Sequence, residues 1–239
     1  MTDEITIVHL YPYEMNIYGD LGNVITLVKR LEWRGYAPKV VPVGVGDAFD
    51  MTTADLVFAG GGQDSGQQTV GADLLARADS LRAAAEAGVV MLAVCGTYQL
   101  FGRSFRISDD TTLAGIGIFD ADTVAGDARL IGTIVIDTPW GELVGFENHS
   151  GQTTLDRSAT ALGRVVRGFG NDASRAHEGA VQHNVFGTYL HGPVLPKNPA
   201  FADHLIGTAL ARRGLPAALA PLDDDLEQRA AEVAKHRPH

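Results

Sequence analysis

The first hundred residues alternate between short apolar runs and longer amphipathic stretches, and this alternation constrains the fold more than any other feature. The apolar runs, at 5–10, 39–45, 55–59 and 89–94, are typical of buried strands. Between them, apolar residues recur every three or four positions over 21–31 and 74–85, which predicts helices. Asp20 is the predicted N-cap of the first helix, and Gly35 and Gly88 end the two stretches. Strands and helices in this order predict an α/β fold whose sheet is mostly parallel, with helices on both faces.

The pattern changes after Gly102. Short strand-like runs follow at 115–124, 130–137, 143–147 and 180–189, separated by Gly, Asp and Asn turns. We expect them to form an antiparallel extension of the same sheet. A helix is predicted over 200–213, and residues 214–239 are expected to form a C-terminal helix or tail. No repeat or clear linker interrupts the chain, so one domain over residues 1–239 is predicted.

Charge and cysteine content exclude several classes of protein. The formal net charge is −10, with 19 Lys and Arg against 29 Asp and Glu, which disfavours binding to nucleic acid or an anionic membrane. No apolar run approaches the ~20 residues of a membrane span, and the acidic start Met1–Glu4 argues against a signal peptide. The single cysteine excludes an internal disulfide. Together these features predict a cytoplasmic protein.

That single cysteine, Cys95, lies where the apolar run 89–94 meets Gly96 and a predicted helix. A strand-to-helix turn of this kind presents the sulfur at the sheet edge, beside backbone N–H groups and the positive end of a helix. Such surroundings stabilise a nucleophilic thiolate. The alternative is a buried structural cysteine that behaves as a small hydrophobic residue.

A cysteine nucleophile needs a base and donors for the oxyanion. Among eight histidines, His191 is the best candidate base because it ends the strand-like run 185–190 just before Gly192. His149 is the second candidate. Gly60–Gly62 follow a strand and free the backbone to aim N–H groups at a ligand. Without a second cysteine or a suitable histidine spacing, no metal site is predicted.

The order of these motifs resembles class I glutamine amidotransferases, in the branch that contains cobyric acid synthase glutaminase domains. The resemblance rests on Gly-Gly-Gly-Gln-Asp at 60–64, Cys-Gly-Thr-Tyr-Gln-Leu-Phe-Gly at 95–102 and Gly-Thr-Tyr-Leu-His-Gly-Pro at 187–193. Within that branch, segments 10–12, 15–23 and 146–151 are similar to the glutaminase (GatD) subunits of lipid II isoglutaminyl synthases.

The resemblance implies a glutaminase that hydrolyses L-glutamine and passes ammonia to a Mur-ligase-like partner, MurT, in a heterodimer. The partner would hold ATP and Mg²⁺ and amidate the D-glutamate α-carboxyl of the lipid II stem peptide, so no cofactor is expected on this chain. The resemblance makes Cys95 the nucleophile, His191 the base, and Gly62 and Gly96 the oxyanion donors. It also implies that Gln99 braces the turn at Cys95.

Arg129 resembles the substrate-binding arginine of that family. Free glutamine carries an α-carboxylate, and a guanidinium binds a carboxylate through two parallel hydrogen bonds. The alternative is a solvated arginine at the start of a strand.

The chain departs from the family pattern at three positions. Ala93 and Thr97 replace glycines on either side of Cys95, and Pro193 stands where the usual triad has a glutamate two residues after the histidine. Loss of a triad carboxylate costs several orders of magnitude in rate. We therefore hypothesise that a carboxylate of the partner subunit completes the site. The in-chain alternatives are Asp20, Glu147, Glu178 and Asp203.

Three other functions remain open from the sequence. A glutaminase for corrinoid amidation would keep the chemistry and change the acceptor. A stand-alone cysteine hydrolase would need no partner. A non-catalytic regulatory subunit would explain the missing glutamate, although Cys95 and His191 are both retained.

Overall fold

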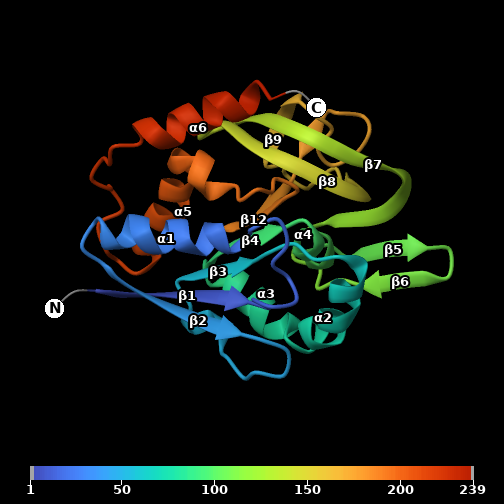
Figure 1. The fold of residues 1–239 in the computed structure, drawn as a ribbon. Coiled ribbons are helices and arrows are strands. Elements are labelled where there is room, and N and C mark those ends of the chain that lie inside the picture. Colours follow the sequence, from blue (N-terminus) through green and yellow to red (C-terminus); the bar gives the residue numbers. More distant parts are fainter. Residues whose placement is uncertain (1–2, 238–239) are drawn as a thin grey trace.

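The protein is described here by a computed structural model that covers residues 3–237 and contains two β-sheets (Figure 1). The first sheet has the strand order β11-β12-β4-β3-β1-β2. All neighbours in it are parallel except β11, which runs antiparallel to β12. Its strands are β1 (Glu4–Leu10), β2 (Ala37–Val43), β3 (Leu56–Ala59), β4 (Val90–Val94), β11 (Ala180–Gln182) and β12 (Val185–Thr188).

Helices cover both faces of this sheet (Figure 1), with α1 (Leu21–Glu32) and α5 (Pro199–Arg212) on one face and α2 (Asp64–Ala76) and α3 (Ala78–Glu86) on the other. A short helix, α4 (Gly96–Phe101), follows β4 directly. The predicted apolar face of α1 is confirmed for Val24 and Leu31, which are buried together with Leu27, but Leu21 and Ile25 are exposed.

The start of α1 differs from the sequence prediction. Asp20 holds the N-cap position, but its side chain makes no capping hydrogen bond. The Asn16 side chain caps the helix instead: its Oδ1 accepts a hydrogen bond from the Leu21 N–H at 2.8 Å. The Asp20 carboxylate is therefore available for another contact.

The second sheet has the order β10-β9-β7-β5-β6, with β8 paired to β7. Its strands are β5 (Ser104–Ser108), β6 (Thr111–Ala114), β7 (Ala121–Thr138), β8 (Gly141–Leu155), β9 (Gly163–Arg167) and β10 (His177–Glu178). The runs 115–124, 130–137 and 143–147 were predicted to extend the first sheet, and this was wrong, because their strand residues belong to β7 and β8 of the second sheet. Only the run 180–189 joins the first sheet, as β11 and β12, and β5, β6, β9 and β10 were not predicted. Strands β7 and β8 pair along most of their length, but an irregularity between Ala125 and Leu130 interrupts the pairing, and the sequence pattern did not reveal the hairpin.

Two further boundaries also differ. The segment predicted as one helix over 74–85 is the end of α2 and all of α3, which meet at Arg77. Helix α2 begins at residue 64, ten residues before the predicted start. The sequence did not indicate its first turns, because Gly66, Thr69 and Gly71 have low helix propensity. Residues 115–118, predicted as strand, lie outside the strands.

The final helix, α6 (Asp225–Lys235), buries none of its residues and contacts β7, β8 and the short 3₁₀ helix η2 (Leu195–Lys197). It crosses the molecule beside α5 in Figure 1. Across the described residues 3–237, no helix has the length and apolarity needed to cross a membrane.

Candidate active site

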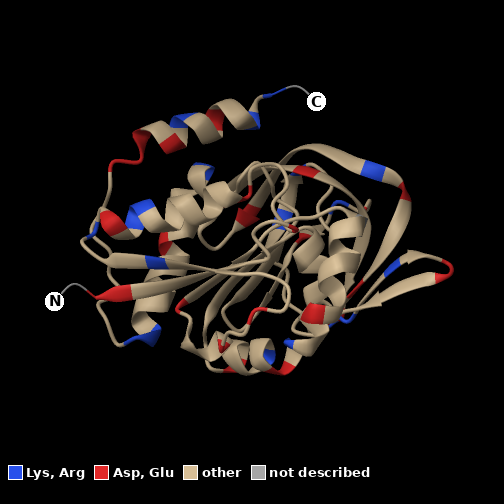
Figure 2. Cartoon of the chain, turned by 60° about the horizontal axis from the view of Figure 1, so that its bottom comes forward, with Lys and Arg blue, Asp and Glu red and all other residues tan. Residues whose placement is uncertain are grey.

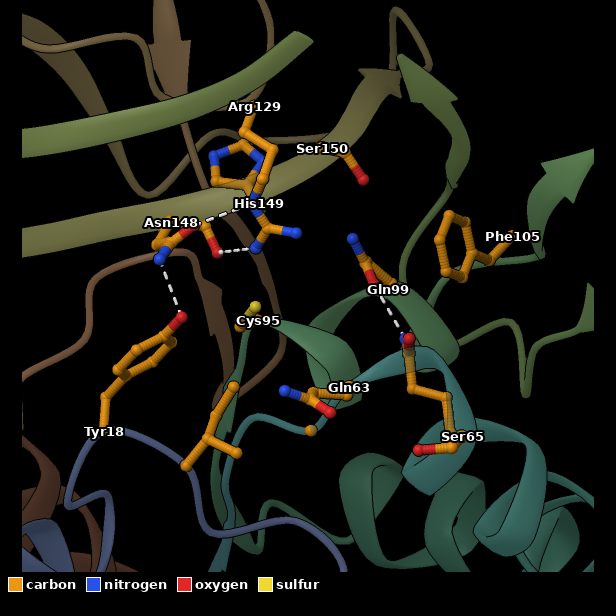
Figure 3. Close-up of a pocket in the computed structure, with 13 residues that line it drawn as sticks. Tyr18, Gln63, Ser65, Cys95, Gln99, Phe105, Arg129, Asn148, His149 and Ser150 are labelled. Carbon is orange, nitrogen blue, oxygen red and sulfur yellow. Dashed lines mark hydrogen bonds between the residues drawn. The ribbon is translucent and has the colours of Figure 1, made fainter. Parts of the chain in front are cut away.

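Cys95 occupies a strained turn between β4 and α4. Its backbone has φ 51° and ψ −106°, a left-handed conformation that non-glycine residues rarely adopt. The Cys95 N–H donates to the Thr188 carbonyl at the end of β12, at 2.7 Å. This sharp turn presents the side chain to a cavity of about 330 Å³ (Figure 3). The geometry matches the strand-to-helix elbow that exposes nucleophiles in other hydrolases.

The residues that depart from the family pattern fit this turn. The Thr97 hydroxyl donates to the Gly60 carbonyl at 2.6 Å, which ties the elbow to the loop after β3. Ala93 is fully buried and lies opposite Ala59 and Gly187 on the neighbouring strands, where only a small side chain fits. The turn therefore keeps its shape without the two glycines.

The two glycines expected to supply oxyanion donors lie in contact. A Cβ added to Gly96 would stand 3.0 Å from the Gly62 carbonyl oxygen and 3.1 Å from the Gly62 nitrogen. The side chain of Gln67 fixes this region by donating to the Gly96 carbonyl at 3.0 Å and to Gln99 Oε1 at 2.7 Å. Gln99 in turn donates to the Tyr189 hydroxyl at 3.2 Å, which braces the elbow as predicted.

His191 follows β12 and is buried, with 1% of its surface exposed. Its backbone pairs with Phe146 of β8, which holds the ring beside the elbow. The Nδ1 atom lies 3.3 Å from Asp20 Oδ1. The second oxygen of Asp20 accepts a hydrogen bond from the Gly61 N–H at 2.7 Å, so the carboxylate is fixed between the ring and the loop after β3.

The charge state of His191 follows from its neighbours. Burial alone lowers its pKa, but interactions with the neighbouring Cys95 and the hydrogen bond with Asp20 outweigh burial and raise the pKa to about 10. Among the described residues, no group makes a fully formed hydrogen bond with Nε2. Hydrogen bonds of this kind are often long in unliganded enzymes. Nε2 is thus the nitrogen free to exchange a proton with the sulfur.

Asp20 takes the place that the sequence analysis gave to a partner's carboxylate. The hypothesis of a partner-supplied acid is therefore not needed to explain the orientation of His191. Pro193, which stands at the usual glutamate position, packs against α1 instead. A Cβ added to Gly22 of α1 would lie only 2.4 Å from Pro193 Cγ.

The other three in-chain candidates for the acid are engaged elsewhere. Glu147 accepts hydrogen bonds from the N–H groups of residues 169 and 170, at 2.8 and 2.9 Å. Glu178 accepts from the Tyr189 N–H at 2.6 Å. Asp203 pairs with Arg30 and with a second arginine of α1, Arg34, at 2.7 Å each.

His149, the second candidate base, lies in the cavity wall in a different state. Its ring stacks on Tyr189 with centroids 3.6 Å apart, and its Nδ1 lies 2.8 Å from the Gly151 carbonyl oxygen. Burial, with smaller contributions from the positive charges of His191 and Arg129, lowers its pKa to about 4. A neutral, stacked ring of this kind shapes the cavity and does not fit the role of base.

Arg129 lies on the irregular part of β7 and reaches over the cavity that Cys95 enters from below (Figure 3). Its Nε donates to Asn148 Oδ1 at 3.0 Å. Asn148 in turn donates from Nδ2 to the Tyr18 hydroxyl at 2.7 Å, and the Tyr18 ring stands edge-on to His191 with centroids 5.0 Å apart. Arg129 and Cys95 thus face one cavity, with room between them for an amino acid.

Sequence reasoning missed Tyr18 and Asn148 as individual site residues. Both lie inside the segments 15–23 and 146–151, which were singled out only as family motifs. The local signal was Gly19, because glycine often marks a turn. In the structure both Tyr18 and Gly19 have positive φ, 54° and 80°.

Sequence comparisons agree with this geometry. A profile of the CobB/CobQ-like glutamine amidotransferase domain matches residues 6–199. The chain is 38% identical to the GatD subunit of a glutamine-hydrolysing lipid II isoglutaminyl synthase from Staphylococcus aureus, over 96% of this chain and 94% of that protein. The GatD subunit of Streptococcus pneumoniae is 37% identical over 96% and 90%. A probable cobyric acid synthase of Methanococcus maripaludis is 31% identical over 54% of this chain and 28% of its own length.

Two solved structures share the fold. One is a glutamine amidotransferase with a TM-score of 0.57 at 14% identity, covering 84% of this chain and 98% of its own. The other, a glutamine amidotransferase from Thermotoga maritima, has a TM-score of 0.55 at 15% identity and covers 97% and 93%. The predicted fold class is confirmed.

Proposed function

The chain belongs to the CobB/CobQ-like glutamine amidotransferase family, and we propose from this premise that it is the glutaminase subunit of a lipid II isoglutaminyl synthase. It hydrolyses L-glutamine and delivers ammonia to an ATP-dependent, Mur-ligase-like subunit of the MurT kind. That subunit amidates the D-glutamate α-carboxyl of the stem peptide on lipid II. Two GatD subunits match over 96% of the chain and at least 90% of their own length, whereas the cobyric acid synthases match over 44 to 72% of the chain and at most 35% of theirs. This supports the lipid II acceptor over a corrinoid.

In the proposed mechanism, Arg129 binds the α-carboxylate of glutamine and points its side-chain amide toward Cys95. His191, oriented by Asp20, takes the thiol proton, and the sulfur attacks the amide carbon. Backbone N–H groups at Gly62 and Gly96 stabilise the oxyanion of the tetrahedral intermediate. The imidazolium then protonates the leaving nitrogen, and ammonia departs.

A γ-glutamyl thioester on Cys95 remains after ammonia has left. Water attacks its carbonyl carbon with His191 as general base, and glutamate and the free thiol are formed. The ring thus serves as base, acid and base in turn, while the fixed carboxylate of Asp20 stabilises the imidazolium each time it forms.

One arrangement carries the proposal: Cys95 lines the cavity from a strained elbow, and the buried His191, which Asp20 orients, lies close enough to Cys95 to interact with it. A purely regulatory subunit has no need of this arrangement. We further propose that the protein works in the cytoplasm, where its nucleotide-using partner finds ATP.

The test measures glutamate released from glutamine by the purified chain, alone and together with the ligase subunit, ATP and lipid II. We expect release that requires Cys95 and increases in the complex, and no release from Cys95→Ala in either setting. Amide formation on lipid II should require the same cysteine when glutamine is the donor. Release that persists in Cys95→Ala would refute the proposed nucleophile.

A further inference from the structure

A second cavity, of about 850 Å³, lies against the glutamine cavity. Its walls come from β8, from the turn after His191 and from α6, and they include Phe146, Gly192 and Ala230. Among the described residues, Tyr18 is the one that lines both cavities. The two cavities therefore meet at Tyr18, and we take its side chain as the partition between them.

This partition is held weakly. One hydrogen bond, from Asn148 at 2.7 Å, reaches the Tyr18 hydroxyl, and the ring leans on His191 and Phe146 with centroids 5.0 and 6.3 Å away. Tyr18 is 45% exposed, so no core packing fixes its rotamer. Turning the side chain aside breaks this hydrogen bond and the two ring contacts, and it disturbs no core packing.

We propose that ammonia released at Cys95 leaves past Tyr18 and enters this second cavity, from which it reaches the ligase subunit that covers the cavity in the complex. The inference rests on the proposed glutaminase function. In this proposal the Tyr18 side chain gates the passage of ammonia, and the residues of α6 that line the second cavity form one of its walls.

The chemistry of the cavity wall suits neutral ammonia. Ammonia is a nucleophile only while unprotonated, and the cavity carries three cationic side chains, those of Lys197, Arg229 and Arg237. Burial, together with the charge of Arg237, lowers the pKa of Lys197 to about 8. An ammonium ion carries the same charge as these three side chains, so they repel it and leave neutral ammonia unaffected.

The cavity is incomplete in the single chain, which argues for a covering subunit. Leu226 and Val233 of α6 line it, yet they are 68% and 62% exposed. Acidic residues gather at the start of α6, as Figure 2 shows, while its inner face offers these apolar side chains. The cavity is therefore open to solvent along α6 in the single chain, and we expect the ligase subunit to cover this opening in the complex.

The test uses the complex of the full chain with its ligase subunit and two variants, Ala230→Trp and Ala234→Trp, which fill the cavity from α6. Neither position touches the glutamine cavity, and α6 buries none of its residues, so folding should persist. We measure the amide formed per glutamate released, and separately the amide formed from ammonium chloride.

We expect both variants to release glutamate within about twofold of wild type and to lower the amide-to-glutamate ratio at least about fivefold. Amidation from ammonium chloride, which enters at the ligase, should be unchanged. Gln228→Trp is the matched control, because Gln228 lies on the same helix outside the cavity and is exposed.

An unchanged ratio in both variants overturns the exit path. A loss of amidation from both nitrogen donors overturns it too, because α6 would then only hold the ligase subunit. If wild type itself releases no Cys95-dependent glutamate, the proposed function fails, and this result is distinct from either outcome above.

Discussion

Asp20 shows how one side chain can replace a missing family residue. Its carboxylate reaches the Nδ1 side of His191 from the loop before α1, about 170 residues away in sequence. The backbone of Gly61 holds its second oxygen, so the acid is oriented as firmly as one on the histidine's own loop. This arrangement makes the orientation of the base independent of a partner.

Asp20→Asn is expected to lower kcat for glutamate release by roughly 10²- to 10⁴-fold with little change in KM, because a neutral amide does not stabilise the imidazolium. The pKa of His191 should fall in the variant, so its kcat should depend differently on pH. Steady-state kinetics of the purified chain across pH 6–10 measures both effects.

Asp203→Asn is the control, because this residue pairs with arginines of α1 away from the cavity. It should keep kcat in the folded protein. A kcat of Asp20→Asn within threefold of wild type would contradict the role of Asp20 and would favour an acid supplied by the partner subunit.

At the scale of elements, an ion-pair cluster holds the end of the chain in place. Arg30 of α1 is 2% exposed and pairs with Asp203 of α5 at 2.7 Å and with Asp224, the residue before α6, at 2.6 Å. Since α6 buries none of its own residues, this cluster is a main anchor of the helix.

Arg30→Met should therefore lower the free energy of unfolding by about 3 kcal/mol, since it leaves Asp224 without its partner and Asp203 with Arg34 alone. The larger effect should be local: amide hydrogens of α6 should exchange faster, while those of β4 keep their protection relative to global unfolding. Hydrogen exchange with mass spectrometry resolves the two elements.

Arg82→Met, which breaks an exposed ion pair with Asp79, serves as the comparison and should change stability by less than about 1 kcal/mol. Equal exchange of α6 in wild type and Arg30→Met would show that other contacts anchor the helix.

The strand-helix alternation up to residue 94 predicted the parallel sheet because local periodicity and tertiary burial agree there. The same segment placed Cys95 at the elbow, since a turn after a parallel strand must lie at the sheet's carboxyl edge. The second sheet was not predictable, because β7 runs for 18 residues through a bulge that breaks its alternation. Asp20 was one of four in-chain carboxylates that the sequence offered as the acid, but the sequence could not single it out, because its contact with His191 depends on tertiary packing.

At the scale of the whole molecule, buried carboxylates couple stability to pH. Burial raises the pKa of Glu178 to about 8, although hydrogen bonds from Tyr189 and Thr188 oppose this shift. The folded protein therefore keeps a proton that the unfolded chain releases near pH 4.5. The contribution of Glu178 to stability accordingly falls as the pH rises from about 4.5 to about 8.

Glu178→Gln mimics the protonated acid and should match wild type in unfolding free energy at pH 5. At pH 8.5 it should exceed wild type by a few kcal/mol, because each pKa unit corresponds to about 1.4 kcal/mol. Urea denaturation at the two pH values measures the difference. As a control, Glu86→Gln at an exposed position should match the unfolding free energy of wild type at both pH values. If Glu178→Gln also matches wild type at both, the raised pKa of Glu178 is contradicted.

The packing of Pro193 against Gly22 limits where this protein can carry the acid that orients His191. A glutamate at position 193 would lack the proline's contact with α1, and its carboxylate would compete with Asp20 for the same ring nitrogen. Placing the acid on either loop therefore calls for a different approach of α1 to the histidine loop. Moving the acid to position 193 in this protein would therefore require changes at the start of α1 and in the histidine loop together.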